Sequence, residues 1–525
     1  MINPIKANPR SAAWQSRLWI ATLFVFVGIL TRIPFRSQIL NHWDSVNFAL
    51  ALDHYDLRLH QPHPPGPFVI YIMLGRLFNY FLHENNAALV WLSIVLSGLG
   101  IAALYLLAEE MFDRRVALTT GLLALTSPMV WFHGEVALSY ILEFFWVPPI
   151  LYACYRMQKR SSGALLASAL LLGLAGGVRP NTPVFLFPVW LLAVFFNRYP
   201  WKKVLLSFVF MGVGVLFWAI PMVVWTGGVR AYIEQFIWWQ NQHTEESGSL
   251  FGVMEFVVRF GAYLTYTLGP GLLALAWAGW RALPGGWRTL QNRLAPLVNR
   301  TAPAPGWRQR LNAFWKQDWD WRWLVMAAWI LPGSFYLTVI HIRQPGHTFT
   351  VLPGYILLTG AALASLTRTR RAWLGLSGLI VAVNGVFFLA APEYLFGDQR
   401  MLFTTPSWNA IHNYDQDISM RLESIRANFP SAETTILANG RNFRLPSYYL
   451  KDYAFPALSY QIDSETVRLA APIHYLVLFD DVALPPGASD LKLQSIPLPN
   501  GTPMRYLAWG SEQVVEISRQ ALTIK

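Results

Sequence analysis

HWDSVNF (residues 42–48) and HQPHPPGP (residues 60–67) follow the first apolar segment of the chain and bound its densest group of polar side chains. A carboxylate and several histidines stand there between hydrophobic segments, beside prolines that each restrain their own backbone and that of the preceding residue. Ionisable groups held at a membrane in this way are often functional. We therefore expect residues 42–67, called here the 42–67 segment, to carry chemistry at a membrane surface.

The composition of the chain indicates a polytopic membrane protein. Of its 525 residues 54% are apolar and only 13% are charged, whereas about a quarter are charged in a typical soluble protein. The formal charge of +12 comes from clusters of Lys and Arg between apolar segments, which favours anionic lipid headgroups rather than nucleic acid as partners. Cys154 is the only cysteine, so neither an intrachain disulfide nor a cysteine metal site can form.

Eleven apolar stretches have about the 17–25 residues that are needed to cross a bilayer. They cover residues 17–33, 87–109, 115–132, 137–155, 163–178, 183–197, 204–225, 252–280, 322–341, 348–366 and 372–391. Lys6, Arg10 and Arg17 precede the apolar run of the first stretch, which begins at Leu18, and no small-residue cleavage site follows it. We interpret this stretch as an uncleaved anchor with a cytoplasmic N-terminus.

The segment from Pro67 to Leu82 decides the topology. If it crossed the membrane, every later basic cluster would lie outside, against the positive-inside rule. Arg76 and Asn79 interrupt this short, aromatic-rich run, which favours an interfacial helix, with an ordinary short span as the alternative. The first loop (residues 34–86) and everything after Ala391 are then expected outside.

The tail of the chain differs from the rest. Residues 392–525 carry more charge, alternating apolar runs and turn signals, with a helix expected near 408–428. We predict a transmembrane domain over residues 1–391 and a small α/β or mostly β soluble domain over residues 392–525, outside the membrane.

Two residues of the 42–67 segment are candidates for a site. Asp44 begins an amphipathic surface helix, where it could act on a substrate or simply cap the helix. His63 is placed rigidly by the surrounding prolines, which suits a site, although a simple turn explains it equally well.

Further candidates stand at the outer ends of later spans. Arg179 and Arg343 could hold a phosphate by bidentate hydrogen bonds, or extend toward lipid headgroups. Glu135 is a candidate functional carboxylate, whereas we expect Glu143, inside a span, to be bonded within the bundle. His243, His341 and His347 share the outer face and could bind phosphate or a metal, although no fixed ligand spacing supports a metal.

The order of these motifs resembles that of the GT-C membrane glycosyltransferases, and within them the protein-mannosyltransferase and aminoarabinose-transferase-like group. The resemblance covers about residues 15–390 and rests on an acidic residue in the first-loop helix followed by recurring short motifs. These are HPPGP (63–67), FDRR (112–115), GEVAL (134–138), GVRPN (177–181), FIWWQ (236–240) and RQPGH (343–347).

This resemblance implies inverting transfer of a sugar from a polyprenyl-phosphate donor to a hydroxyl of a lipid, glycan or protein at the outer face of a bacterial plasma membrane. Asp44 would be the general base, its basicity raised by desolvation. Arg179, Arg343 and His347 would stabilise the leaving phosphate, with His63, Glu135, His243 and His341 as supporting candidates.

Two departures from the group stand out. Ser45 replaces a second acid that many relatives carry after the first, and Ser139 and Tyr140 stand where relatives have an aspartate. Glu135 could supply the missing carboxylate. The cofactor is therefore left open, with a divalent metal on Asp44 and Glu135 as one option.

Two other functions remain as alternatives. A flippase or transporter of lipid-linked sugars would place polar groups near the membrane midplane, whereas here they gather at one face. A non-catalytic member that binds a partner through its tail is favoured by the break in the acidic pair.

Overall fold

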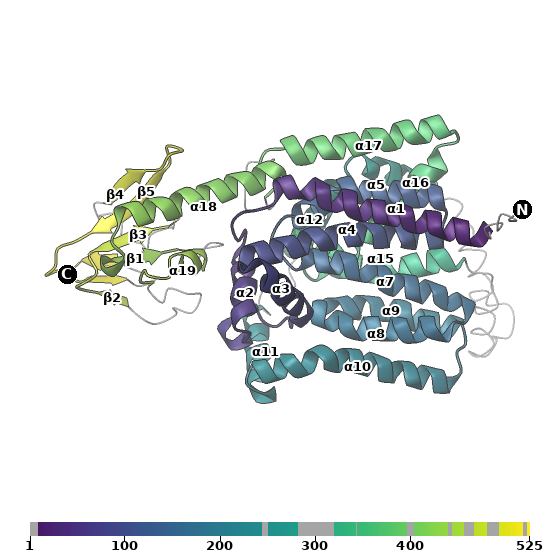
Figure 1. Cartoon of the computed structure of the whole chain (residues 1–525), viewed down its shortest axis with the longest axis horizontal. Coiled ribbons are helices and arrows are strands. Elements are labelled where there is room, and N and C mark those ends of the chain that lie inside the picture. The colour runs from purple at the N-terminus through teal and green to yellow at the C-terminus, as the bar shows by residue number, and fades with distance from the viewer. Residues whose placement is uncertain are drawn as a thin grey trace, which may run out of the picture.

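The computed structural model describes residues 9–243, 250–281, 320–342, 344–395, 404–438, 444–455, 467–479, 493–517 and 522–524. It is a helical bundle with a smaller C-terminal region beyond one of its ends (Figure 1). The bundle contains α1 (Pro9–Arg32), α4 (Asn85–Met111), α5 (Arg114–Thr126), α6 (Pro128–His133), α7 (Tyr140–Arg156), α8 (Ser162–Val178), α9 (Asn181–Phe196), α10 (Trp201–Trp225), α12 (Leu250–Leu268), α15 (Trp321–Val339), α16 (Leu352–Leu366) and α17 (Arg370–Ala390).

Each of the eleven expected spans coincides with helical structure, and the predicted fold class is confirmed. Among the described helices, four are each long and apolar enough to cross a membrane: Trp14–Phe35, Asn85–Met111, Trp201–Trp225 and Arg370–Ala390. Proline interrupts two of the expected spans, one between α5 and α6 before Pro128 and the other at Gly269 and Pro270. Proline has no N–H to continue a helix, which explains both breaks. The exact number of spans stays a prediction.

Close packing holds the bundle around α4, which contacts α1, α5 and α7. Where α1 and α4 meet, a Cβ on Gly28 would lie 2.8 Å from the Gly98 Cα atom, so glycine is needed there for the backbones to approach. Small residues at helix crossings are the usual means of packing helices in membranes.

The segment from Pro67 to Leu82 forms α3 (Val69–Leu82), a helix of 14 residues. At 1.5 Å per residue it is about 21 Å long, shorter than the roughly 30 Å hydrocarbon core. It lies beside α2 (Trp43–Asp53) at the end of the bundle that faces the C-terminal region (Figure 1). Arg76 donates hydrogen bonds to the carbonyls of Leu52 (2.8 Å) and Ala51 (3.1 Å), which fastens α3 to α2.

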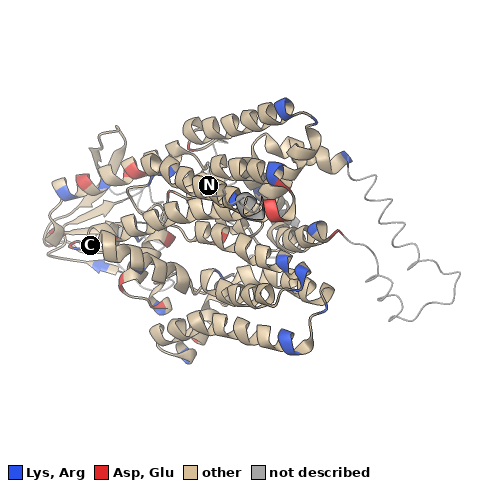
Figure 2. Cartoon of the chain, turned by 45° about the vertical axis from the view of Figure 1, so that its right-hand side comes forward, with Lys and Arg blue, Asp and Glu red and all other residues tan. Residues whose placement is uncertain are grey.

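Lys and Arg residues of the bundle gather toward its opposite end (Figure 2). Arg17 and Lys159 both pair there with Glu110, at 3.0 and 2.9 Å. The basic clusters thus gather at one end, as the positive-inside argument predicted, and α2 and α3 lie at the other.

The C-terminal region combines helices and sheets, as predicted. α18 (Trp408–Asn428) leads to a four-stranded sheet of order β1-β3-β5-β4, in which β1 and β3 are parallel and the other pairs antiparallel. A second, antiparallel sheet has the order β2-β6-β7. The strands are β1 (Thr434–Leu437), β2 (Val467–Leu469), β3 (Tyr475–Leu478), β4 (Gln494–Pro497), β5 (Pro503–Ala508), β6 (Val515–Ile517) and β7 (Leu522–Ile524), with α19 (Leu445–Tyr449) between β1 and β2. The predicted domain boundary at 391/392 falls between α17 and α18.

Candidate active site

Asp44 lies in the first turn of α2 and is not its cap. His42 is the N-cap residue: its Nδ1 accepts the Asp44 backbone N–H at 3.1 Å and lies 3.4 Å from Asp44 Oδ2. The capping role considered for Asp44 is therefore filled by His42. Within the described structure, Asp44 Oδ1 is buried and has no hydrogen-bond partner. This carboxylate thus has one oxygen beside His42 Nδ1 and one that makes no hydrogen bond among the described residues.

The pKa of Asp44 is lowered, whereas the resemblance led us to expect that desolvation would raise it. Burial acts to raise it, as expected, but the hydrogen bond with His42 and the charges of His42, His63 and Arg179 outweigh burial and hold the pKa below its ordinary value. Desolvation therefore does not make Asp44 a stronger base in the ligand-free protein. The carboxylate instead stays ionised over the whole neutral pH range.

His63 lies beside α2 because the proline-rich turn folds back onto it. Its ring is 4.6 Å from the Trp43 ring and 5.7 Å from the His60 ring. The turn is anchored by Tyr55, whose hydroxyl donates to the Pro67 carbonyl at 2.6 Å. The rigid placement predicted for His63 thus brings it close to Asp44.

Arg179 reaches the same region from the junction of α8 and α9. Its Nη1 lies 3.8 Å from Glu143 Oε2 and 3.4 Å from the Gly346 carbonyl oxygen, and its guanidinium carbon lies 4.5 Å from the centre of the Tyr140 ring. The side chain is only 13% exposed. These contacts keep its guanidinium away from bulk solvent, and its charge acts on the Asp44 carboxylate.

Glu143 holds Arg179 from inside the bundle. Its Oε1 accepts hydrogen bonds from the hydroxyls of Thr182 (2.5 Å) and Thr350 (2.6 Å), which join α7 to α9 and to the 3₁₀ helix η5 (Pro345–Thr350). A buried carboxylate needs such partners. The prediction that Glu143 is bonded within the bundle is confirmed.

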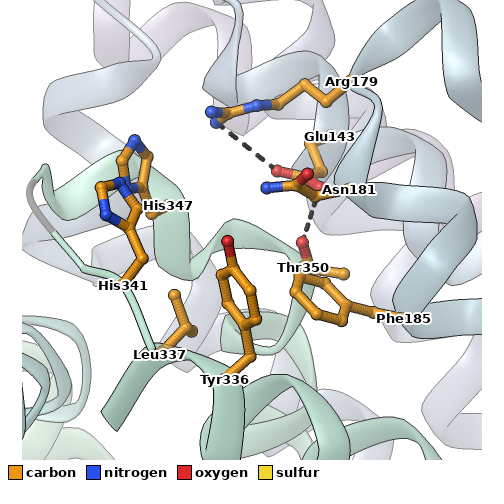
Figure 3. Close-up of a pocket in the computed structure, with 9 residues that line it drawn as sticks. All are labelled: Glu143, Arg179, Asn181, Phe185, Tyr336, Leu337, His341, His347 and Thr350. Atoms are coloured by element: carbon orange, nitrogen blue, oxygen red, sulfur yellow. Dashed lines mark hydrogen bonds and ion pairs between the residues drawn. The ribbon is translucent and has the colours of Figure 1, made fainter. Parts of the chain in front are cut away.

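A small pocket lies next to this pair (Figure 3). His341 and His347 stand on one side of it, their ring centres 5.4 Å apart, across from Arg179 and Glu143. Its lining residues are Glu143, Arg179, Asn181, Phe185, Tyr336, Leu337, His341, His347 and Thr350. Three residues predicted from sequence, Arg179, His341 and His347, therefore meet at one pocket.

Other predicted residues have different positions. Glu135 is wholly buried, and the charged side chain near it is Arg32 rather than Asp44. Arg343 lies outside the described residues, and His243 ends α11 (Val229–His243), with its side chain likewise outside the description. In the described parts of the chain, no three His, Cys, Asp or Glu side chains are grouped as metal ligands. Among the described residues, Asp44 and Glu135 are thus not grouped as ligands of one metal ion.

Tyr140 also belongs to the site. From the sequence it was noted only because it stands, with Ser139, where the resembling family has an aspartate. It begins α7, lies under the Arg179 guanidinium, and its hydroxyl donates to the Gln344 side-chain oxygen at the start of η5. A pairing across about 200 residues leaves no local sequence signal. Asn181, which also lines the pocket, stood in the quoted GVRPN motif and could have been chosen on that ground.

Gly346 permits the packing of η5 on Tyr140, because a Cβ at this position would overlap the Tyr140 ring. We expect Gly346→Ala to displace η5 and to lower stability by about 1–3 kcal/mol, as overpacking does. Thermal unfolding in detergent measures this. Gly378→Ala on α17, where a Cβ meets nothing within 4 Å, is the matched control and should be neutral or stabilising. Equal unfolding temperatures for the two variants would contradict the tight packing.

Comparison with known proteins agrees with this structure. The family model for dolichyl-phosphate-mannose-protein mannosyltransferases matches residues 62–225. The structure of ArnT from Cupriavidus metallidurans in the apo state is similar over 95% of this chain and 98% of that chain, with 14% identity and a TM-score of 0.53. The same protein bound to undecaprenyl phosphate gives 12% identity and a TM-score of 0.55 over the same shares. No curated protein matches the sequence.

The comparisons agree with the resemblance in two respects: residues 62–225 match the mannosyltransferase family model, and nearly the whole chain shares the fold of ArnT. ArnT, whose fold the chain shares, has also been solved with undecaprenyl phosphate bound.

Proposed function

We propose that this protein is an inverting glycosyltransferase that moves a sugar from a polyprenyl-phosphate donor to an acceptor hydroxyl at the outer membrane face. The observation that carries the proposal is a buried carboxylate oxygen of Asp44 without a hydrogen-bond partner among the described residues, on a residue whose pKa is lowered in part by the charge of Arg179 from a distant part of the chain. The likeness to ArnT bound to undecaprenyl phosphate supports the donor class.

Asp44 is the general base in this mechanism. Its Oδ1, which has no hydrogen-bond partner among the described residues, takes the proton of the acceptor hydroxyl as that oxygen attacks the anomeric carbon of the sugar. The bond from the anomeric carbon to the phosphate oxygen breaks on the opposite face, so the configuration inverts. His42 accepts the Asp44 backbone N–H and so fixes the start of the helix that carries this carboxylate.

Arg179 stabilises the phosphate that leaves with the lipid, because charge accumulates on the phosphate oxygens as the bond breaks. His341 and His347 complete the phosphate site from the facing side of the pocket. Arg343 stays a predicted phosphate ligand. Glu143, Thr182 and Thr350 position Arg179.

Donor binding also prepares the base. A phosphate beside Arg179 offsets one of the positive charges that hold the pKa of Asp44 down. The pKa of Asp44 therefore rises when the donor is bound, and its affinity for the acceptor proton increases at the step where it is needed.

The polar groups of the candidate site gather at one end of the bundle. This favours an enzyme over a transporter, which would have a site near the membrane midplane.

The direct test is transfer by the full-length protein in nanodiscs, supplied with radiolabelled polyprenyl-phosphate sugars and candidate acceptors. We expect a labelled product whose anomeric configuration, read by NMR, is opposite to that of the donor. A product with retained configuration would contradict the single displacement, and failure to bind any polyprenyl phosphate would contradict the donor class.

The orientation expected for a bacterial plasma membrane is an additional proposal, with the N-terminus in the cytoplasm and the C-terminal region outside. Cysteines at exposed positions Asp53 and Asn500 should react with an impermeant reagent added to intact cells, whereas one at exposed Arg160 should react only after lysis. The native Cys154 is buried and provides a low background. Labelling of Arg160→Cys in intact cells would overturn this orientation.

A further inference from the structure

Arg444 of the C-terminal region contacts both halves of the 42–67 segment. Its Nη1 donates to Asn47 Oδ1 at 2.8 Å and to the carbonyls of Leu59 at 3.1 Å and His60 at 3.3 Å. Asn47 lies on α2 one turn after Asp44, while Leu59 and His60 belong to the turn that leads to the prolines. One guanidinium thus ties the helix that carries the base to the turn that carries His63.

The backbone at this turn needs support. His60 has a φ of +57°, in the left-handed region that side chains other than glycine rarely adopt. Two of the three Arg444 hydrogen bonds go to the carbonyls of Leu59 and His60 themselves. If they were lost, the turn could relax and carry His63 away from Asp44.

The C-terminal region also forms hydrogen bonds with residues 37–40, the segment that leads into α2. Asp415 on α18 accepts hydrogen bonds from the Ser37 hydroxyl (2.8 Å) and the Gln38 backbone N–H (2.6 Å). Tyr449 on α19 accepts the Leu40 N–H at 3.1 Å. Contacts from α18, from α19 and from the residue before α19 therefore fix the chain on both sides of Asp44.

We propose that the C-terminal region acts as a clamp, meaning that its contacts hold the 42–67 segment in one conformation. Arg444 is then a positioning residue that keeps His63 and its turn close to Asp44. The catalytic consequence rests on the proposed glycosyl transfer, whereas the clamp itself is a statement about the local order of the segment. The two can therefore be tested separately.

Hydrogen exchange of the full-length protein in nanodiscs, read by mass spectrometry, tests the clamp without any substrate. We expect Arg444→Met to speed exchange of amides within residues 45–62 by about tenfold or more, because local opening becomes easier. Arg444→Lys should largely restore protection. All three hydrogen bonds are donated by the single Nη1 atom, and a lysine ammonium group carries three N–H donors. Arg468→Met, which removes an ion pair to Glu516 within the C-terminal region, is the matched control and should leave residues 45–62 unchanged.

A milder variant covers the case in which Arg444→Met lowers overall stability. Tyr449→Phe removes only the hydroxyl that accepts from Leu40, so faster exchange should be confined to the chain entering α2. Wild-type exchange in residues 45–62 of a folded Arg444→Met variant, or at Leu40 in Tyr449→Phe, would overturn the clamp.

Transfer kinetics then test the positioning role. We expect Arg444→Met to lower kcat by about tenfold or more while the donor KM changes by less than about threefold, with rescue by lysine. Unchanged kcat together with faster exchange would refute positioning of the base. If no variant and no wild-type protein transferred sugar, the proposed function would fail while the exchange result would still decide the clamp.

Discussion

Asp44→Asn is expected to lower kcat for sugar transfer by about 10²- to 10⁴-fold, the usual contribution of a general base. The amide cannot take the acceptor proton at Oδ1, although it is nearly the same size as the carboxylate and can still contact His42. Initial rates with a radiolabelled polyprenyl-phosphate donor measure the effect. Donor affinity should change little, because the role proposed for Asp44 is toward the acceptor.

Asp53→Asn is the matched control for this prediction. Asp53 ends the same helix, is exposed, and accepts a hydrogen bond from the Asn85 side chain at 2.9 Å, which an amide oxygen can also accept. Its rate should stay within about twofold of wild type, as is usual for surface positions away from the chemistry. Normal turnover by a folded Asp44→Asn protein would rule out the base role.

Arg179→Met is expected to lower kcat/KM by about 10²- to 10³-fold, because the cation proposed to stabilise the leaving phosphate is lost. The same change leaves the Glu143 carboxylate buried beside the pocket without its cation. Removing one partner of a buried ion pair typically costs about 3–5 kcal/mol of stability. Activity and unfolding must therefore be measured together.

The double variant Glu143→Gln/Arg179→Met separates the two effects. A glutamine oxygen can still accept from Thr182 and Thr350, so the double variant should regain most of the lost stability. It should still bind undecaprenyl phosphate weakly, because no cation has been restored. Wild-type affinity for undecaprenyl phosphate in the double variant would exclude Arg179 from the phosphate site.

Much of the fold follows from local sequence properties. The apolar stretches all became helices because each must satisfy its own backbone hydrogen bonds inside a bilayer. Pro67 to Leu82 was predicted to be an interfacial helix and forms a helix of 14 residues, while its position relative to the bilayer stays a prediction. The helix α18 covers the residues expected for it. Pro128 and Pro270 mark breaks that the length count alone overlooked.

The candidate site was only partly predictable. Arg179, His341 and His347 were chosen separately and meet at one pocket, and His63 lies beside α2. The cap of α2, the direction of the Asp44 pKa shift and the neighbour of Glu135 all differ from expectation, because each depends on which charged or polar groups from other segments pack nearby.

By itself, the sequence determined a multi-span membrane protein with a charged end, a polar first loop and an α/β tail, because hydropathy, charge order and turn residues act over short stretches of chain. Only the tertiary structure decided that Asp44 lies near Arg179 and that Glu143 pairs with that arginine. It also decided that Arg444, almost 400 residues away in sequence, donates hydrogen bonds to the 42–67 segment. Such pairings depend on the packing of whole helices, and a single sequence carries no periodic signal for them.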